Sequence, residues 1–458
     1  MSLPEAFSLE HFVPGCFERT HSLKTSGGTL AFSSVCEDFV FRAPDGHPEA
    51  SIFTFSYLCP SEGPRPVMFL WNGGPGSATS ALHLECFGPW LIRRDEEGRF
   101  AYGLDENPDC LLPQCDLVFV DPVGVGLSRL LDPDKAGKYF SVDGDARSTA
   151  FVIIEWLRRH ARWNSPVYIC GESYGTVRAC RVIAELGRSP YSESRMVPGI
   201  PVQGVALIGW AAGESGQSTV LSMMPAMAAT HWYHMKERPC AQDAFVKQAQ
   251  AFASERLLPA LYEGDALEDD RRRALAAELE TYTGVSAEYY LASGLDITPE
   301  AFQRMALPGY TLDLYDTRLA TPVSQTYQLL GGDNMPLQVM NGLLMPRLGV
   351  ELERLYYTGN LNVHAQFCME TEDLGEETRT HMQCLKSGME RTPGMRLLFA
   401  SGLYDLCTHA GNTRYVVSHA GLPRERVKVC EYLGGHGVYS TEEGRAAFMQ
   451  DMRELLGR

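Results

Sequence analysis

Residues 167–176 read Val-Tyr-Ile-Cys-Gly-Glu-Ser-Tyr-Gly-Thr, a short apolar run that breaks into Gly-x-Ser-x-Gly and then into a helical pattern. The stretch predicts a strand, a tight turn and a helix, with Ser173 at the turn. Gly171 and Gly175 give the backbone room for a corner at which a strained serine holds its hydroxyl above the edge of a sheet. Because the chain has 43 glycines, the pentapeptide alone also fits an ordinary glycine-rich turn, and its context has to decide.

The bulk composition is that of a folded globular protein. Hydrophobic residues make up 45% and charged residues 21% of the 458 positions, which excludes a disordered or collagen-like chain. No apolar run approaches the roughly 20 residues that a membrane helix needs, and the net charge of −17 disfavours nucleic acid and anionic membranes as partners. Residues 1–10 lack the basic and apolar segments of a secretory signal, so we expect a cytoplasmic location.

The thirteen cysteines are an odd number and too sparse for a disulfide scaffold. We expect reduced thiols, many of them inside apolar runs, where a free cysteine behaves as a small hydrophobic residue. Cys110 and Cys115 are spaced wrongly for a Cys-x-x-Cys redox or zinc site, and no second such pair exists. The sequence therefore implies neither a metal nor another cofactor.

Apolar runs and helical patterns alternate along the first half of the chain. Residues 21–58 alternate polar and apolar positions between turn signals, which predicts antiparallel hairpins. Unbroken apolar runs at 66–71, 116–120 and 203–210 predict strands buried on both faces, and the first two are followed by glycine loops. This order predicts a mostly parallel sheet that binds ligands at the carboxyl ends of its strands.

Helical patterns dominate for well over a hundred residues after the last of these strands, and two further core strands follow at 395–401 and 427–433. The fold class that this order predicts is α/β, an α/β-hydrolase fold whose mostly parallel central sheet carries an inserted, largely helical cap. We place the first part of the core at residues 1–211, the cap at 212–376 and the second part of the core at 377–458. A separate second helical domain is the alternative.

A serine hydroxyl becomes a nucleophile when an imidazole takes its proton, and the imidazole needs a carboxylate that fixes its tautomer. In this fold the order along the chain is nucleophile, acid, histidine. Asp405 follows the predicted strand at 395–401, and His436 lies in Gly-Gly-His-Gly directly after the last strand, so Ser173, Asp405 and His436 form the predicted catalytic triad. His409 and His419 fall in or near the intervening helix, where we expect them at the surface.

The negative charge that develops on the substrate oxygen needs backbone N–H donors. One predicted donor is Tyr174, directly after the nucleophile, and the other is Gly74 in the glycine loop at 72–77. That loop alone also fits a tight turn or a phosphate cradle. No Lys-Ser/Thr pair follows it, which disfavours a nucleotide site.

Several glycine-rich stretches accompany the predicted triad. Asn-Gly-Gly-Pro-Gly-Ser occupies residues 72–77, Asp-Pro-Val-Gly-Val-Gly-Leu-Ser occupies 121–128, and the elbow occupies 171–175. Together with Asp405 and His436, these motifs resemble the serine carboxypeptidases.

The resemblance runs from about residue 51 to the C-terminus and is weakest in the cap. It is closer to the bacterial branch of the family in residues 145–148, Asp-Ala-Arg-Ser, and 174–178, Tyr-Gly-Thr-Val-Arg. It implies that the C-terminal residue of a peptide substrate is released through an acyl-enzyme on Ser173. It also implies that Asn72 and Glu172 bind the free carboxylate of the substrate.

The family pairs this glutamate with a second acid, and here the sequence departs from the pattern. Counting from Gly76 to Gly88 puts Cys86 at the position of the second acid. Glu85 lies one residue earlier, which turns a side chain by about 100° around a helix. The role of Glu85 and the acidic pH optimum that the resemblance implies therefore stay open.

The same residues also fit two other functions. An esterase or acyltransferase with the same triad is one alternative, and an inactive binding or protective protein on a hydrolase fold is another. The spacing of His231 and His234 fits a ligand pair, but we expect cap histidines, and the tyrosines at 289–290 and 310–315 fit cap packing better than a substrate pocket. The oligomeric state is left open, a homodimer included.

Overall fold

The structure is a computed structural model that describes residues 12–25, 27–187, 199–213, 216, 218–325, 334–371 and 380–457. The chain divides into two compact units. The first unit consists of residues 1–207, 333–398 and 449–458, and the second of residues 208–332 and 399–448. The predicted limits of the cap, 212 and 376, stay a prediction, and residue 376 lies outside the described residues.

The sheet of the first unit begins with antiparallel hairpins, as the sequence predicts. Strands β1 (Cys16–Thr25), β2 (Gly28–Arg42) and β3 (Pro48–Leu58) pair antiparallel, and β3 pairs antiparallel with β7 (Asp116–Asp121). Strand β4 (Val67–Trp71) then pairs parallel with both β7 and β9 (Val167–Glu172). Every residue of β4, β7 and β9 is buried, which explains their unbroken apolar runs.

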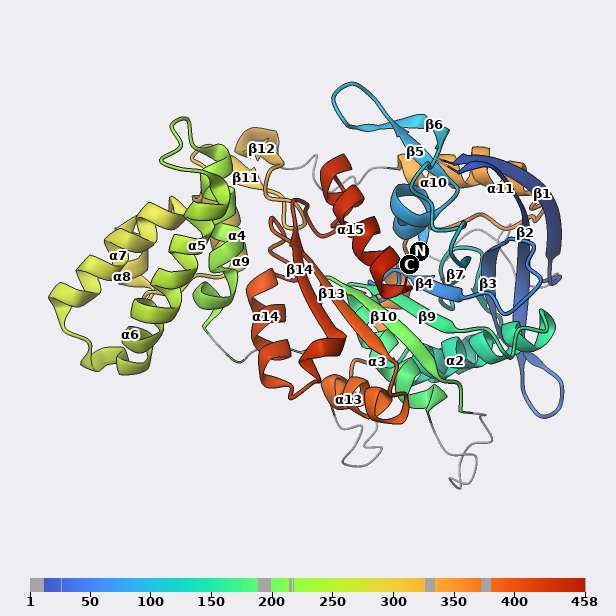
Figure 1. Ribbon diagram of the computed structural model, residues 1–458. Helices are drawn as coiled ribbons and strands as arrows, with labels where there is room; N and C mark the ends of the chain where they lie inside the picture. Colours follow the sequence, from blue (N-terminus) through green and yellow to red (C-terminus); the bar gives the residue numbers. More distant parts are fainter. Residues whose placement is uncertain are drawn as a thin grey trace. The chain divides into compact units, whose positions relative to one another are not determined.

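The strand order is β1-β2-β3-β7-β4-β9-β10-β13, with β10 at Val202–Ile208 and β13 at Arg396–Gly402, and the last residues of β10 and β13 belong to the second unit. Helix α3 (Tyr174–Leu186) lies beside α2 (Val142–Arg159) and α13 (His381–Arg391), as Figure 1 shows. The α/β-hydrolase prediction is confirmed: strands and helices alternate around a mostly parallel sheet.

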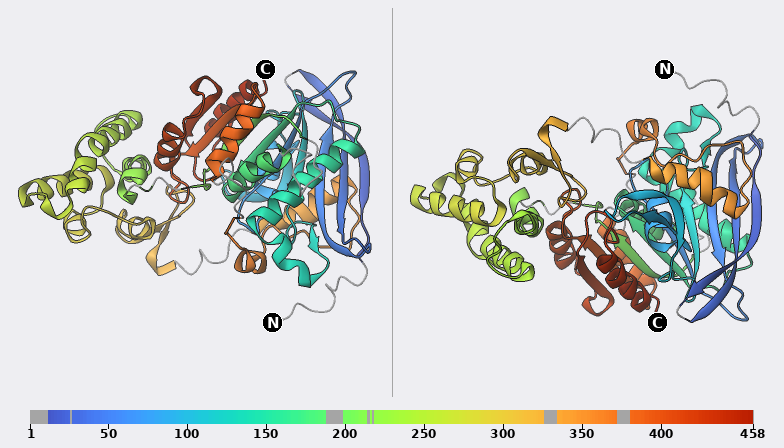
Figure 2. Two further views of the ribbon diagram at one scale, coloured as in Figure 1. Left: turned by 90° about the horizontal axis from the view of Figure 1, so that it is seen from below. Right: turned by 90° about the horizontal axis from the view of Figure 1, so that it is seen from above.

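The other elements of the first unit are short. Helix α11 lies beside β1 and α10 beside β6 (Figure 1), and the right-hand view of Figure 2 shows the orange helices of this stretch beside the blue strands. The remaining bounds are those of π-helix η2 (Leu82–Phe87), β5 (Trp90–Arg94), β6 (Phe100–Glu106), β8 (Arg129–Leu130), η3 (Pro133–Lys135), α1 (Ala136–Tyr139), α10 (Met335–Val339), π-helix η7 (Met340–Leu344), α11 (Met345–Leu348) and α12 (Leu361–Gln366).

The second unit is largely helical between residues 219 and 305, as the sequence predicts. Its core is built on α4 (Thr219–His234), whose methionines Met223, Met224 and Met227 are fully buried against the neighbouring helices. The helical elements that follow are α5 (Gln242–Phe252), π-helix η4 (Ala253–Leu257), α6 (Leu258–Glu263), η5 (Gly264–Ala266), α7 (Asp269–Thr283), α8 (Ala287–Ala292) and α9 (Pro299–Met305).

A small hairpin and two core strands complete the second unit. Strands β11 (Tyr310–Leu312) and β12 (Ala320–Pro322) pair antiparallel, and β13 neighbours β14 (Val427–Tyr432). The remaining bounds are those of α14 (Ala410–His419), η9 (Arg424–Arg426) and α15 (Glu442–Leu455), the last of which continues into the first unit.

All thirteen cysteines lie in the described residues and are free thiols. Over the described part of the chain, no helix is both long and apolar enough to cross a membrane. The cytoplasmic location stays a prediction.

Candidate active site

The turn between β9 and α3 has the backbone geometry that the predicted nucleophile elbow requires. Ser173 has φ 58° and ψ −128°, a backbone conformation that residues other than glycine rarely adopt, and its side chain is only partly buried. A Cβ atom on Gly171 would lie 2.2 Å from the carbonyl oxygen of Gly175. Gly171 therefore has no room for a side chain, because the backbone turns back on it at this corner. A Cβ atom on Gly175 would lie 2.9 Å from the carbonyl oxygen of Asn72, so the first glycine loop requires the second glycine.

The first glycine loop packs directly on the elbow. A Cβ atom on Gly73 would lie 2.6 Å from the backbone nitrogen of Tyr174 and 2.7 Å from the Cβ atom of Ser173. Gly74, with φ +106°, follows in the same loop. The loop and the backbone nitrogen of Tyr174 thus meet beside the serine, which is the arrangement that the predicted oxyanion hole requires.

Asn72 and Glu172, the predicted carboxylate-binding residues, are hydrogen-bonded neighbours. The Asn72 Nδ2 atom donates to Glu172 Oε1 at 2.9 Å, and both side chains are buried. Asn72 Oδ1 accepts from the backbone nitrogen of Leu82 at 3.0 Å. The Asn72 amide is therefore held from both ends. Its partner Glu172 directly precedes Ser173 in the sequence, and Asn72 itself begins the first glycine loop.

The helix after the glycine loop is the π-helix η2, which the sequence did not predict. Glu85 on this helix accepts from Arg94 Nη2 at 3.2 Å, and the buried Cys86 Sγ lies 3.8 Å from Met449 Sδ. The role of Glu85 as a second acid stays a prediction.

A buried ionic network joins the elbow helix to the glycine loop. Arg178, only 1% exposed, donates through Nε to Asp145 Oδ2 at 2.7 Å and through Nη1 to the backbone oxygen of Asn72 at 2.8 Å. The hydroxyl of Tyr174 donates to the same Asp145 oxygen at 3.1 Å. Burial raises the pKa of Asp145, while the charge of Arg178 opposes this rise.

In the sequence, Asp145 and Arg178 contribute only to the resemblance to the bacterial branch of the family. A sequence signal for this network does exist, namely a charged residue on an otherwise apolar helix face. Such a residue is buried in the folded protein and therefore needs a buried partner of opposite charge. Within the first unit the network fixes the backbone of the glycine loop relative to the start of α3.

A segment from the later part of the chain also binds both glycine loops. The backbone nitrogen of Asn360 donates to Gly76 O at 2.8 Å, and its Nδ2 atom donates to Gly124 O at 2.8 Å. The ring of Phe367, at the end of α12, lies edge-on to the Tyr174 ring with 5.2 Å between centroids. Residues 360–367 thus cover the elbow side of the first unit, which sequence reasoning missed.

Asp405 and His436 form a hydrogen-bonded pair in the second unit. Asp405 Oδ2 lies 2.8 Å from His436 Nδ1, and the carboxylate is fully buried. The backbone nitrogens of Cys407 and Thr408 donate to Oδ1 at 2.7 and 3.2 Å, and the Thr408 hydroxyl donates to Oδ2 at 2.5 Å.

These contacts set the charge of the pair. Burial alone would raise the pKa of Asp405, but the neighbouring His436 and the hydrogen bonds from Thr408 outweigh it and lower the pKa below its usual value. An ionised Asp405 accepts a hydrogen bond from the Nδ1–H group of His436. The neutral imidazole then carries its proton on Nδ1, and Nε2 keeps the lone pair that a general base needs.

The chain directly after β10 approaches this pair at a glycine. A Cβ atom on Gly209, with φ +61°, would lie 2.7 Å from Thr408 Oγ1 and 3.2 Å from Cε1 of His436. The other histidines near these loops are placed differently. His409 is the N-cap residue of α14, and the exposed His419 stacks on Tyr415 with 3.9 Å between centroids.

His231 and His234, whose spacing fits a ligand pair, contact neighbouring parts of the second unit. His234 Nε2 lies 2.8 Å from the backbone oxygen of Thr317, and the His231 ring packs under Gly284. Among the residues that the structure describes, no group of three or more His, Cys, Asp or Glu side chains is arranged to hold a metal ion.

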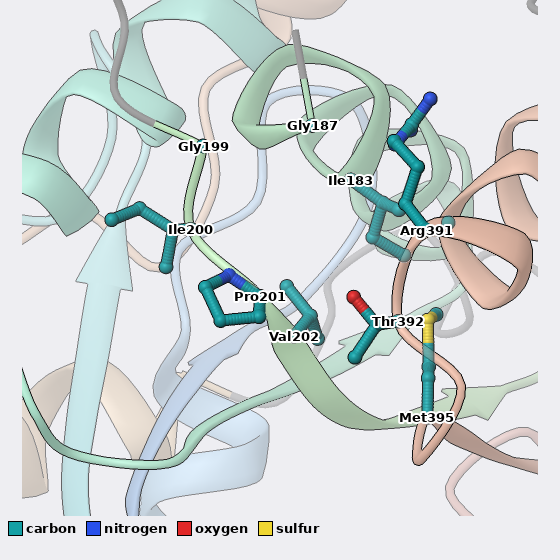
Figure 3. A pocket seen from close by; sticks show the side chains of 10 residues that line it. Ile183, Gly187, Gly199, Ile200, Pro201, Val202, Arg391, Thr392 and Met395 are labelled. Atoms are coloured by element: carbon teal, nitrogen blue, oxygen red, sulfur yellow. The ribbon is translucent and has the colours of Figure 1, made fainter. Parts of the chain in front are cut away.

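A cavity of about 180 Å³ lies at the far end of α3 (Figure 3). It is lined by Ile183, Pro201, Arg391 and Met395, among others. Ser173 precedes the first residue of this 13-residue helix, so the helix separates the cavity from the serine by about 20 Å. This cavity is therefore not part of the predicted active site around Ser173.

A second buried carboxylate near the glycine loops gives a testable pH effect. Asp121 Oδ1 accepts from the backbone nitrogen of Thr79 at 2.8 Å and from the Tyr356 hydroxyl at 3.2 Å, while Oδ2 has no hydrogen-bond partner within the described residues. Burial raises the pKa of Asp121 to about 6. The folded state therefore binds this proton more tightly than the unfolded state, and stability falls as the pH rises from 4 to 6.

We expect Asp121→Asn to remove this part of the pH dependence, which amounts to about 2 kcal/mol of unfolding free energy between pH 4 and pH 7. Urea unfolding at both pH values measures it as the difference between wild type and variant. Asp270→Asn, at a side chain that is 94% exposed, is the matched control and leaves the pH dependence as in wild type. An Asp121→Asn variant with the wild-type pH dependence would contradict the assignment.

Known proteins share the fold described above, and a known family matches the stretch that carries the glycine motifs. The family model described as "Serine carboxypeptidase" matches residues 48–291. Among solved structures, Kex1(Δ)p, a prohormone-processing carboxypeptidase from Saccharomyces cerevisiae, is 11% identical and aligns over 92% of this chain and 91% of its own with a TM-score of 0.57. No curated protein matches the sequence.

Two further structures are more distant. A thermostable carboxyl esterase from Bacillus coagulans is 12% identical and covers 92% of this chain and 99% of its own, with a TM-score of 0.38. A proline iminopeptidase from Mycobacterium smegmatis is also 12% identical and covers 92% and 98%, with a TM-score of 0.36. The structural likeness shows the fold alone, whereas the family model spans more than half of the chain and includes both glycine loops and the elbow. The chain belongs to the serine carboxypeptidase family.

Proposed function

We propose that this protein is a peptidase that releases the C-terminal residue of peptides through an acyl-enzyme on Ser173. The observation that carries the proposal is the buried hydrogen bond between Asn72 and Glu172, because it places two groups able to bind a carboxylate beside the strained serine. Family membership supports the same chemistry.

In the proposed mechanism, His436 Nε2 takes the proton of the Ser173 hydroxyl while the serine oxygen attacks the carbonyl carbon of the last peptide bond. Asp405 holds the imidazole through Nδ1 and stabilises the imidazolium. The backbone N–H groups of Gly74 and Tyr174 bind the oxyanion.

The tetrahedral intermediate then collapses. The C–N bond breaks, and His436 gives its proton to the departing amine, which leaves as the free amino acid. Water enters, loses a proton to His436 and attacks the ester carbonyl. The serine oxygen takes that proton back, and the shortened peptide leaves as a carboxylate.

The free carboxylate of the substrate distinguishes this activity from endopeptidase cleavage. The Asn72 amide is a hydrogen-bond donor, and a protonated Glu172 is a second one, whereas an ionised Glu172 would repel the carboxylate. Arg178 contributes indirectly, since it holds the backbone oxygen of Asn72.

The experiment compares N-blocked dipeptides with their C-terminal amides. We expect the free acids to be cleaved at least tenfold faster in kcat/KM, because each lost charge-assisted hydrogen bond costs about 1.5 to 3 kcal/mol. Asn72→Ala should remove most of this preference. The exposed amide Gln366, changed to Ala, is the matched control.

Equal cleavage of acids and amides would refute carboxylate recognition. Cleavage of acyl esters without any cleavage of peptides would identify an esterase with the same triad. Neither peptide nor ester turnover, together with no covalent labelling of Ser173, would point to the inactive binding protein.

A further inference from the structure

The tip of the β11–β12 hairpin, residues 313–319, is fastened to the loops that carry the Asp405–His436 pair. The backbone nitrogen of Leu406 donates to Leu314 O at 3.1 Å, and that of His436 donates to Tyr315 O at 2.6 Å. The hairpin and both loops belong to the second unit. The backbone of Tyr315 is thus fixed directly on the proposed catalytic histidine.

The tip is also fixed from within. Asp313 Oδ1 accepts from the backbone nitrogens of Tyr315 at 2.8 Å and Asp316 at 2.9 Å. Arg318 pairs with Asp316 and donates through Nη2 to Ser440 Oγ at 3.2 Å. These bonds give the turn one conformation before any substrate binds, which lowers the entropic cost of using its side chains for binding.

The side chain of Tyr315 does not share the burial of its backbone. The residue is 52% exposed, and its ring lies 5.2 Å from the His436 ring, centroid to centroid, at an angle of 57°. Burial of part of the ring and the nearby Cys407, Asp313 and Asp405 raise the pKa of the phenol, so it stays neutral. An exposed, neutral aromatic face on a rigid turn is a surface for apolar groups.

In acyl transfer, the leaving group of the substrate is the part that comes close to the exposed face of the Tyr315 ring. The histidine that takes the serine proton must give it to the leaving atom, so that atom comes within hydrogen-bond distance of Nε2, about 2.6 to 3.2 Å. A side chain attached next to the leaving atom then lies within reach of a ring 5.2 Å from the imidazole.

We propose that Tyr315 is a specificity-determining residue that packs against the leaving group and favours large apolar or aromatic leaving groups. This inference rests on the proposed role of His436 as the acid that protonates the leaving atom. For a carboxypeptidase, the leaving group is the C-terminal amino acid, and for an esterase it is the alcohol. Tyr315 acts on the same side of the scissile bond in both.

The test compares two esters that share one N-blocked acyl group and differ only in the alcohol, benzyl or methyl. We expect wild type to prefer the benzyl ester in kcat/KM, and Tyr315→Ala to lower the benzyl-to-methyl ratio about tenfold. Tyr315→Phe keeps the ring and should keep the ratio. Tyr310→Ala, at an exposed tyrosine on the same hairpin, is the matched control and should also keep it.

The ratio of two substrates on one preparation does not depend on how much of the variant is folded, so partial misfolding cannot imitate the effect. An equal loss for both esters would show that the ring only positions His436, and an unchanged ratio would show that it does not contact the leaving group. Either result overturns the proposal. A second pair, blocked dipeptides ending in Phe or Gly, separates the two claims: a shifted ester ratio with no peptide cleavage supports Tyr315 and refutes the peptidase.

Discussion

Ser173→Ala is expected to abolish turnover, with kcat lower by about a millionfold, and to abolish labelling by an organophosphorus reagent. The reason is that the elbow offers no substitute hydroxyl. Thr176, one turn along α3, donates its own hydroxyl to the backbone oxygen of Ser173 at 2.8 Å. The remaining rate should reflect only substrate binding and the oxyanion hole.

Active-site labelling and single-turnover kinetics measure the two effects separately. Ser254→Ala, at an exposed serine of the second unit, is the control and should keep full labelling. Alanine is preferred to glycine at position 173 because it keeps a Cβ atom at φ 58°, so the variant retains the backbone strain of the wild type and loses only the hydroxyl. Labelling or turnover that persists in the variant would refute the acyl-enzyme on Ser173.

The parts of the fold that the sequence predicted are those with local causes. Strands β4, β7 and β9 are buried on both faces, so an unbroken apolar run of the right length is enough to identify them. The elbow was only partly local: a Cβ atom on Gly171 would clash with the carbonyl oxygen of Gly175 within the motif, whereas Gly175 is required by the approach of the distant Asn72. Apart from Glu85 on η2, the predicted site residues lie at or shortly after the end of a core strand, which is a rule of the fold rather than of side-chain packing.

The parts that escaped prediction depend on distant contacts. The bond from His436 to Tyr315 joins residues more than a hundred positions apart, and nothing in the tyrosine-rich stretch at 310–315 distinguishes ring exposure from cap packing. Arg178 shows the same limit. Its charge inside a buried helix indicates that it has a partner, but only the structure identifies Asp145 and the backbone oxygen of Asn72.

The π-helix η2 has a different cause. Its sequence, Leu-His-Leu-Glu-Cys-Phe at residues 82–87, is compatible with an ordinary α-helix, and the wider turn has no local sequence signal. The comparison of Cys86 with Glu85 assumed α-helical geometry after the glycine loop. Because the observed helix is wider, the angle between successive side chains differs from the assumed 100°, and the question of the second acid has to be settled by mutation of Glu85.

Asp405→Asn is expected to lower kcat by about four orders of magnitude while the protein stays folded. The structure gives a specific reason. Two backbone N–H groups, from Cys407 and Thr408, donate to Oδ1, so the oxygen of an asparagine amide must occupy that position. The amide nitrogen then replaces Oδ2 and faces His436 Nδ1. A donor there selects the tautomer with its proton on Nε2, which cannot take the proton of the serine.

The measurement is made at neutral pH, where the lowered pKa of Asp405 keeps the wild-type carboxylate ionised. Such a group stabilises the fold above the unfolded pKa and loses this effect as the pH falls through the lower, folded pKa. The variant should therefore lose stability relative to wild type at neutral pH and less at low pH, whereas its loss of kcat comes from the tautomer. Thr408→Val is the comparison, since it removes a hydrogen bond to Oδ2 but keeps the carboxylate. If Asp405→Asn retained more than a tenth of the wild-type kcat, Asp405 would not be the residue that orients His436.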